Sequence, residues 1–183
     1  MMLRIALVIT ALGAACTNAP ASDGKKDAGP SDVDAPPLGD PIDATAGVWT
    51  FVDFPDSSCD DGSSTGIGVN IGTSNNLLVF FSGGGACWDF QTCFTLNTAE
   101  HGPFKKAQLD QITQGGSPNT VVDRSDAANP FQDWSYVFVP YCTGDIHAGD
   151  VVQTYTSGTT SKTLAHVGHK NVLAYLERIG ATF

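Results

Sequence analysis

The sequence predicts an α/β fold in which a doubly wound sheet forms the middle of three αβα layers. Two apolar runs, Leu77–Phe81 and residues 134–140, lack the alternation of a half-exposed strand, which is typical of parallel strands covered on both faces. A weakly periodic segment at 103–113 separates them, and residues 167–179 have clear helical spacing. The order strand, helix, strand, helix indicates the opening half of such a sheet.

Two further strands are expected before this unit. Residues 48–52 are aromatic and β-branched and precede a cluster of turn residues, while residues 67–71 alternate apolar and small side chains. These two segments predict an antiparallel pair. Residues 151–155 predict a short additional strand. The helix at 167–179 is expected to bury one apolar stripe, consisting of Val172, Leu173, Leu176 and Ile179.

Length and charge narrow the class of protein. With 183 residues, of which 42% are hydrophobic, the chain can form one ordinary core. Its formal net charge is −10 and it has only nine Lys and Arg residues, which argues against a nucleic-acid partner because phosphate backbones need a basic face. The glycine-containing segments lack dinucleotide and phosphate-loop spacing, so we expect neither a nucleotide nor any other cofactor.

The N-terminus has the features of an export signal. Arg4 supplies positive charge, residues 5–12 are apolar, and small residues precede Cys16. This ending resembles a bacterial lipoprotein signal, in which the cysteine is lipidated; the alternative is ordinary cleavage near Ala15 or Ala21. We expect an exported protein, either an outer-membrane or cell-surface lipoprotein or a secreted one, with membrane contact only through the lipid.

The chain therefore divides into three parts. Residues 1–16 form the export signal. Residues 17–46 consist mainly of Asp, Pro, Ala, Gly and Ser, and a segment with so little apolar surface is expected to be a disordered linker. Residues 47–183 are expected to fold as one α/β domain.

The most informative motif is the apolar run Leu77–Phe81 that leads into Gly83, Gly84 and Gly85. A buried strand that ends in glycines leaves backbone N–H groups free at its carboxyl end, and such groups form the oxyanion hole of many esterases. Trp88 and Asp89 follow directly. They would line a substrate cleft or, in the alternative that we leave open, provide aromatic packing and a helix N-cap.

Histidines and acidic residues form a second candidate cluster. His166 and His169 are three residues apart and could share a helix face with a metal ion near Asp145, His147 or Asp150. The structural alternative places both histidines at the entry of the helix, while Asp145 and His147 hydrogen-bond the loop after Cys142. We favour this structural interpretation and predict no metal site.

Five cysteines, together with an export signal, indicate an oxidising compartment. If Cys16 carries a lipid, four remain, and four cysteines allow three pairings between which the sequence does not choose. Buried free thiols are the alternative. A zinc site is disfavoured because the chain contains no Cys-x-x-Cys.

Several motifs in fixed order carry a family resemblance. They are, in order, SGGGACWD at 82–89 followed by Cys93, NPF at 129–131, DW at 133–134 leading to VPYCTGDIHAGD at 139–150, and HVGHKNV at 166–172. This arrangement resembles the pectin acetylesterase and Notum family of secreted serine esterases. The resemblance implies an α/β-hydrolase fold, a Ser-Asp-His triad and a substrate that is an acylated carbohydrate or another ester.

Carried over to this chain, the resemblance assigns the oxyanion hole to the amides of Gly84 and Gly85. It also implies two disulfides, Cys59 with Cys142 and Cys87 with Cys93.

The departure from the family is equally informative, because the family's serine lies in a glycine-flanked elbow that we expect after the strand that would follow Phe183, and its Asp and His come later still. We therefore expect the N-terminal half of an α/β-hydrolase sheet, truncated before the nucleophile elbow, inactive alone, and with an open apolar edge beside the strand at 134–140. The alternative function is a non-catalytic, lipid-anchored, disulfide-stapled binding module.

Overall fold

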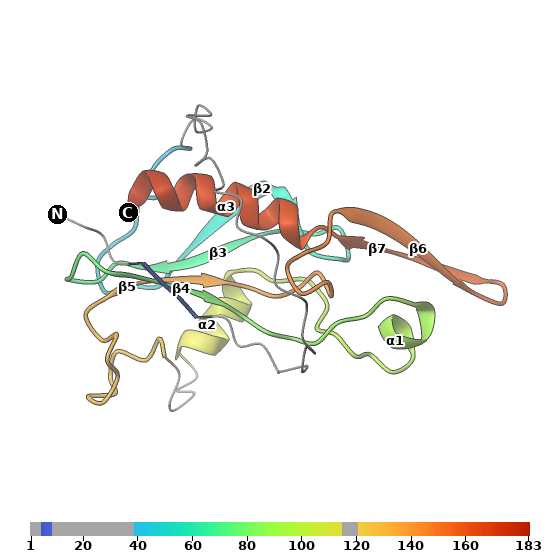
Figure 1. The fold of residues 1–183 in the computed structure, drawn as a ribbon, viewed down its shortest axis with the longest axis horizontal. Helices are drawn as coiled ribbons and strands as arrows, with labels where there is room; N and C mark the ends of the chain where they lie inside the picture. Colours follow the sequence, from blue (N-terminus) through green and yellow to red (C-terminus); the bar gives the residue numbers. More distant parts are fainter. Residues whose placement is uncertain (1–4, 9–38, 115–120) are drawn as a thin grey trace, which may run out of the picture.

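The computed structural model describes residues 5–8, 39–114 and 121–183 and contains a five-stranded mixed sheet, a separate hairpin and three helices (Figure 1). The strands are β1 (Ile5–Val8), β2 (Thr50–Ser58), β3 (Ser64–Asn70), β4 (Leu77–Phe81), β5 (Ser135–Val139), β6 (Val151–Ser157) and β7 (Thr160–His166). The helices are α1 (Phe90–Phe94), α2 (Lys106–Gln114) and α3 (Gly168–Thr182). None of the helices in these ranges has the length and apolar character needed to cross a bilayer.

The sheet has the strand order β1-β4-β5-β3-β2 and confirms the predicted α/β class. β4 and β5 run parallel, with Leu78 opposite Tyr136. β3 pairs antiparallel with both β5 and β2. The predicted parallel pair and the predicted antiparallel pair are thus joined into one sheet through β3 and β5.

The strand β5 explains why the sequence showed no alternation, since all five of its residues are buried. Val137 and Val139 face the core that also contains Tyr175 and Ile179 of α3. Phe138 faces the opposite core, formed with Leu109 of α2. Helices therefore cover both faces of the sheet, and Figure 1 shows α3 and α2 on opposite sides.

Helix α3 buries only part of the apolar stripe that its sequence predicts. Leu173 and Leu176 are 50% and 47% exposed, whereas the buried residues of the helix are Gly168, Asn171, Tyr175 and Ile179. Tyr175 packs edge-on against Phe54 with ring centroids 4.8 Å apart. Ile179 is buried as predicted, but the expectation for Leu173 and Leu176 is wrong, because the Tyr175 ring and the polar Asn171 take the inner face.

Asn171 is the polar member of that inner face, and its amide completes the end of β2. Its Oδ1 accepts from the backbone N–H of Ser58 at 3.1 Å, and its Nδ2 donates to the Ser58 carbonyl at 2.8 Å. A partly buried strand end whose backbone groups are paired in this way avoids the cost of desolvating unpaired groups. Hydrophobic periodicity cannot detect such a residue.

The expected linker at 17–46 is shorter at its C-terminal end than the composition indicates. Ile42 is only 6% exposed and belongs to the α3-side core, and its backbone N–H donates to Thr182 Oγ1 at 2.8 Å. Ala46 forms a parallel bridge with Ile71. Packed structure therefore begins by residue 39 rather than 47. Cys16 of the export signal and residues 17–38 of the expected linker lie outside the described residues.

The expectation of an open edge beside residues 134–140 is also wrong. β5 lies inside the sheet between β4 and β3, because β3 pairs with it antiparallel at Gly68 and Phe138. The outer edge of β4 is itself paired with β1, which comes from the segment interpreted as the export signal.

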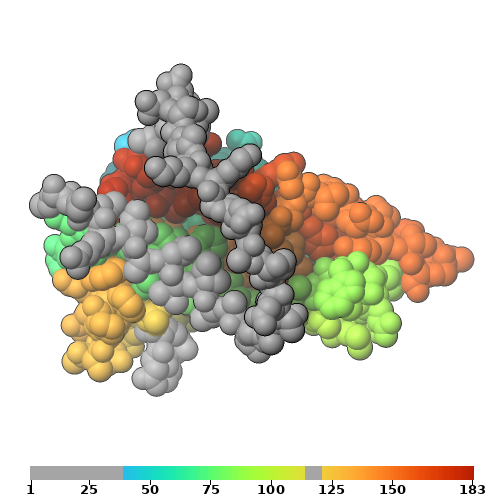
Figure 2. Space-filling view, viewed as in Figure 1, coloured from blue at the N-terminus to red at the C-terminus, as the bar shows by residue number. Residues whose placement is uncertain are grey.

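The strand expected at 151–155 is longer than predicted and has an antiparallel partner. It forms one arm of the β6–β7 hairpin, which projects from the body of the molecule together with the α1 region (Figures 1 and 2).

His166 ends β7, and α3 begins at Gly168, so His166 does not enter the helix as expected. Helix α1 has five residues and begins directly after Asp89, where the sequence left a helix N-cap as an open alternative.

The packing of residues 39–46 gives a direct stability prediction. Replacing Ile42 with Ala should lower the free energy of unfolding by about 2–4 kcal/mol, because it leaves a cavity in the core beneath α3. The control Leu173→Ala, on the exposed face of α3, should change it by less than about 0.5 kcal/mol. Urea unfolding measures both. Equal effects would show that Ile42 is not part of the core.

Candidate functional site

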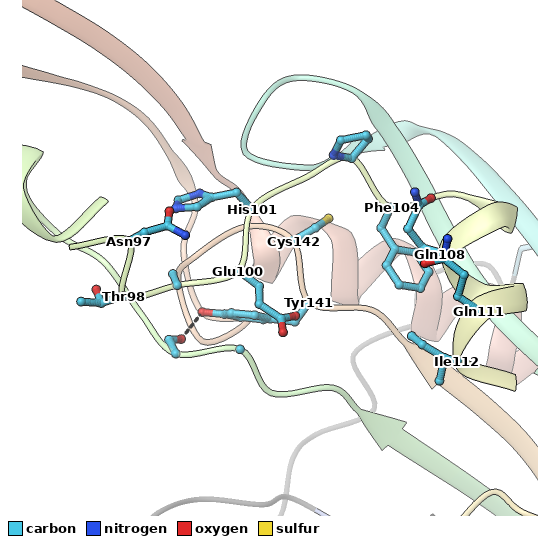
Figure 3. Close-up of a pocket in the computed structure, with 14 residues that line it drawn as sticks. Asn97, Thr98, Glu100, His101, Phe104, Gln108, Gln111, Ile112, Tyr141 and Cys142 are labelled. Atoms are coloured by element: carbon cyan, nitrogen blue, oxygen red, sulfur yellow. Dashed lines mark hydrogen bonds between the residues drawn. The ribbon is translucent and has the colours of Figure 1, made fainter. Parts of the chain in front are cut away.

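A pocket of about 750 Å³ lies between the glycine segment after β4 and helix α2. Figure 3 shows Glu100 and Tyr141 on one side of it and Gln108, Gln111 and Ile112 of α2 on the other. Gly84 and Gly85 also line this pocket. The glycine segment that the sequence singles out therefore borders the cavity.

The glycines hold their position through their carbonyl groups. Gly84 O accepts from the Glu100 backbone N–H at 2.7 Å, and Gly85 O accepts from the Tyr141 hydroxyl at 2.6 Å (Figure 3). Across the described ranges, neither glycine has a hydrogen-bond partner for its own N–H. Gly84 is half-buried and Gly85 is exposed. Two neighbouring N–H donors are thus free to bind an oxygen anion.

Glycine is required at both positions for steric reasons. A Cβ at position 84 would overlap the Tyr141 ring. Gly85 has φ +80°, which L side chains rarely adopt, and a Cβ there would overlap the Thr98 carbonyl. A Cβ at position 83 would have no heavy atom within 4 Å. The close approach of this segment to the Tyr141 ring and to the Thr98 carbonyl thus depends on the last two of the three glycines.

Tyr141 ties the glycine segment to the loop after β5. Its hydroxyl accepts from the Ile146 N–H at 2.7 Å while it donates to Gly85 O. Burial raises the pKa of Tyr141 to about 12, so the hydroxyl keeps its proton and its donor role at neutral pH. His147 adds a second tie through Nε2, which donates to Ser82 O at 2.9 Å.

Asp145 organises the loop itself. Its Oδ1 accepts from Thr143 Oγ1 at 2.6 Å and from the His147 N–H at 3.0 Å. Its Oδ2 accepts from the N–H groups of Gly149 at 3.1 Å and Gly168 at 2.7 Å. These bonds fasten the loop to the first residue of α3, which agrees with the structural interpretation of Asp145 and His147.

The histidine cluster has a different geometry from the metal alternative. His166 Nδ1 lies 2.7 Å from Thr143 O and Nε2 lies 2.9 Å from the Tyr155 hydroxyl, so both ring nitrogens have partners. His169 is exposed on α3, and Asp150 pairs with Lys170 at 2.9 Å. The structure does not bring His166 and His169 together on one helix face.

The two disulfides implied by the resemblance are confirmed. Cys59 bonds to Cys142 and links the end of β2 to the end of β5. Cys87 bonds to Cys93 across the start of α1. The sulfurs of this second pair lie within 4.8 Å of a ring nitrogen of His166, but they are bonded to each other.

Trp88 and Asp89 lie outside the lining of the pocket. Asp89 is the N-cap of α1: its Oδ1 accepts from the Thr92 N–H at 2.7 Å, and this backbone bond holds the pKa of Asp89 below its usual value. Trp88 is 67% exposed. The helix-cap alternative thus describes Asp89, whereas Trp88 provides little packing.

Sequence reasoning missed one pair that borders the pocket. The carboxylate of Asp60 is buried, bonds to His101 Nδ1 and accepts from the Gly102 N–H at 2.9 Å. His101 lines the pocket, and its Nε2 is buried without a partner in the described part of the chain. No local motif links two residues 41 positions apart, so only the fold brings them together.

The contact between Gly84 and Tyr141 predicts different outcomes for adjacent glycines. Gly84→Ala should lower the free energy of unfolding by about 1–3 kcal/mol, because the new methyl group overpacks against the Tyr141 ring. Gly83→Ala should change it by less than about 0.5 kcal/mol, since that position is open. Thermal unfolding compares the two. Equal losses would contradict the close approach at Gly84.

Buried tyrosines predict a loss of stability at alkaline pH. Burial raises the pKa of both Tyr141 and Tyr175 to about 12, whereas unfolded tyrosine ionises near pH 10. The stability of the folded state is therefore unaffected by these groups below about pH 10 and falls as the pH rises from about 10 to 12. Urea unfolding across this range should show a shallower fall for Tyr141→Phe. An unchanged slope would contradict the burial of this hydroxyl.

Comparisons with known proteins agree with the resemblance in the motifs. The sequence profile of the family described as Pectinacetylesterase matches residues 46–181. No curated protein sequence gives a significant match. Among solved structures, the Wnt deacylase Notum from Drosophila is similar, with 17% identity and a TM-score of 0.43 over 72% of this chain. The match covers 37% of the Notum chain. Because the family profile spans most of the sequence, the chain belongs to the pectinacetylesterase family.

Proposed function

We propose that this chain supplies the oxyanion-binding part of an extracytoplasmic carboxylic ester hydrolase of the pectinacetylesterase type. The observation that carries the proposal is the pair of free N–H groups at Gly84 and Gly85 on the border of the pocket. Their carbonyl groups are held by Glu100 and Tyr141, so the donors are fixed before any ligand arrives. Fixed donors stabilise developing charge without reorganisation.

The chemistry follows from acyl transfer. When a nucleophile attacks the ester carbonyl carbon, the carbonyl π electrons move to its oxygen, which becomes an anion. The two amides would hold that oxygen, and loss of one such donor typically lowers the rate by about 10²- to 10³-fold. The Gly-x-Ser-x-Gly at residues 62–66 places Ser64 at the start of β3 and not on a turn from a strand to a helix. We therefore expect no turnover by a serine mechanism from this chain alone.

Substrate and location are part of the same proposal. Membership of the family supports an acylated carbohydrate or another acyl ester as substrate. The disulfides Cys59–Cys142 and Cys87–Cys93 support an oxidising, extracytoplasmic location. We propose that the protein is exported, with a lipid at Cys16 as its membrane attachment.

An anion titration followed by NMR tests the oxyanion site on the protein as it is. Acetate presents a carboxylate oxygen to the two free donors and should shift the amide resonances of Gly84 and Gly85. Gly83→Ala is the matched control and should keep both shifts, whereas Gly84→Ala should lose them because the segment must move away from Tyr141. Shifts that are absent, or that survive in Gly84→Ala, would overturn the assignment.

Turnover of an activated acetate ester separates the enzyme proposal from a non-catalytic binding module. We expect no hydrolysis by the chain alone, with acetate binding retained. Ester hydrolysis that a serine-directed phosphonate abolishes would contradict both the absence of a nucleophile and the binding-module alternative.

A further inference from the structure

The pocket beside the glycine segment contains an unpaired negative charge, that of Glu100. This residue is exposed, and its carboxylate has neither an ion pair nor a hydrogen bond in the described parts of the chain. A Cβ at position 84 would meet the Cβ of Glu100 at 3.0 Å, so the side chain begins beside Gly84. Figure 3 shows it next to Tyr141 at the border of the pocket. The charge therefore lies close to the two free N–H donors.

No cation offsets this charge among the described residues that line the pocket, which include neither Lys nor Arg. Lys105 and Lys106, at the start of α2, lie outside the lining, and each is paired with a carboxylate of its own. His101 does line the pocket, but it is bonded to the buried carboxylate of Asp60. An anionic group in the pocket would thus meet Glu100 without a compensating positive charge.

The rest of the polar lining consists mainly of neutral side-chain amides. Gln108 Oε1 accepts from the Lys105 N–H at 2.9 Å, which leaves the Gln108 NH₂ group as a donor. The amides of Gln111 and Asn97 have no hydrogen-bond partner in the part of the chain that the structure describes. An amide both donates and accepts without carrying charge. Such groups suit the hydroxyl groups of a neutral ligand.

We infer that the alcohol part of the ester bound here is neutral and rich in hydroxyl groups, as in an uncharged sugar, and that Glu100 selects against sugar acids. The inference rests on the proposed ester site at Gly84 and Gly85. The oxyanion formed at the ester carbonyl is met by two N–H donors. A carboxylate on the alcohol part would meet only Glu100 and neutral amides, and like charges so placed weaken binding. Glu100 is thus a specificity-determining residue.

Two acetylated sugars that differ in one group test the inference on the protein as it is. Methyl glucoside and methyl glucuronoside, each with one acetyl group on the same hydroxyl, differ only in a hydroxymethyl group against a carboxylate. NMR titrations at low salt, followed at the Gly84 and Gly85 amides, give both dissociation constants. The neutral sugar should bind about three- to tenfold more tightly, because its rival carries a charge repelled by Glu100. About 0.5 M salt should reduce the difference by screening.

Glu100→Gln removes the charge and keeps the shape, so the two sugars should then bind within about twofold of each other. The matched control is Glu177→Gln, which removes an exposed carboxylate from α3, on the side of the sheet opposite α2 (Figure 1). It changes the net charge equally and should keep the natural preference.

A preference that persists in Glu100→Gln, or tighter binding of the sugar acid by the natural chain, would overturn the inference. Failure of both sugars to bind would overturn it as well. In that case, shifts of the same two amides with acetate would show that the oxyanion proposal survives, whereas their absence would refute both.

Discussion

The structure depends on the burial of β5 between two neighbours of opposite direction. β4 pairs with it parallel and β3 antiparallel, and its side chains alternate between the α3 core and the α2 core. Because β4 and β5 are parallel, their carboxyl ends meet at one edge of the sheet. The glycine segment after β4 and the polar loop after β5 are therefore brought together by strand direction alone.

At that edge, hydrogen bonds between polar groups hold the glycine segment and the loop after β5 in place. The Tyr141 hydroxyl joins Gly85 O to the Ile146 N–H, and His147 holds Ser82 O. The carboxylate of Asp145 fastens the same loop to the first residue of α3. Each of these groups is satisfied by a backbone partner, which makes the loop rigid and leaves the amides of Gly84 and Gly85 as free donors beside the pocket.

Residues 5–8 fit two structural interpretations. As a short apolar run near the N-terminus they indicate an export signal, and in the structure they form the edge strand β1, parallel to β4. Both interpretations depend on the lack of charge in this run. A polar, proline-rich composition likewise does not exclude a buried residue, because Ile42 packs in the core and its N–H bonds to Thr182.

The sequence by itself determined the α/β class, the bounds of β4, the parallel pair β4–β5 and the glycine segment, because continuous apolar runs and glycine triplets are local signals. With the family resemblance it also indicated both disulfides. Tertiary structure decided the inner face of α3, where Asn171 and Tyr175 replace the expected leucines. Asn171 is stabilised there by its hydrogen bonds to the end of β2, which hydrophobic periodicity cannot detect. It alone paired Asp60 with His101 and β1 with β4, since contacts between distant residues depend on chain topology and leave no local pattern.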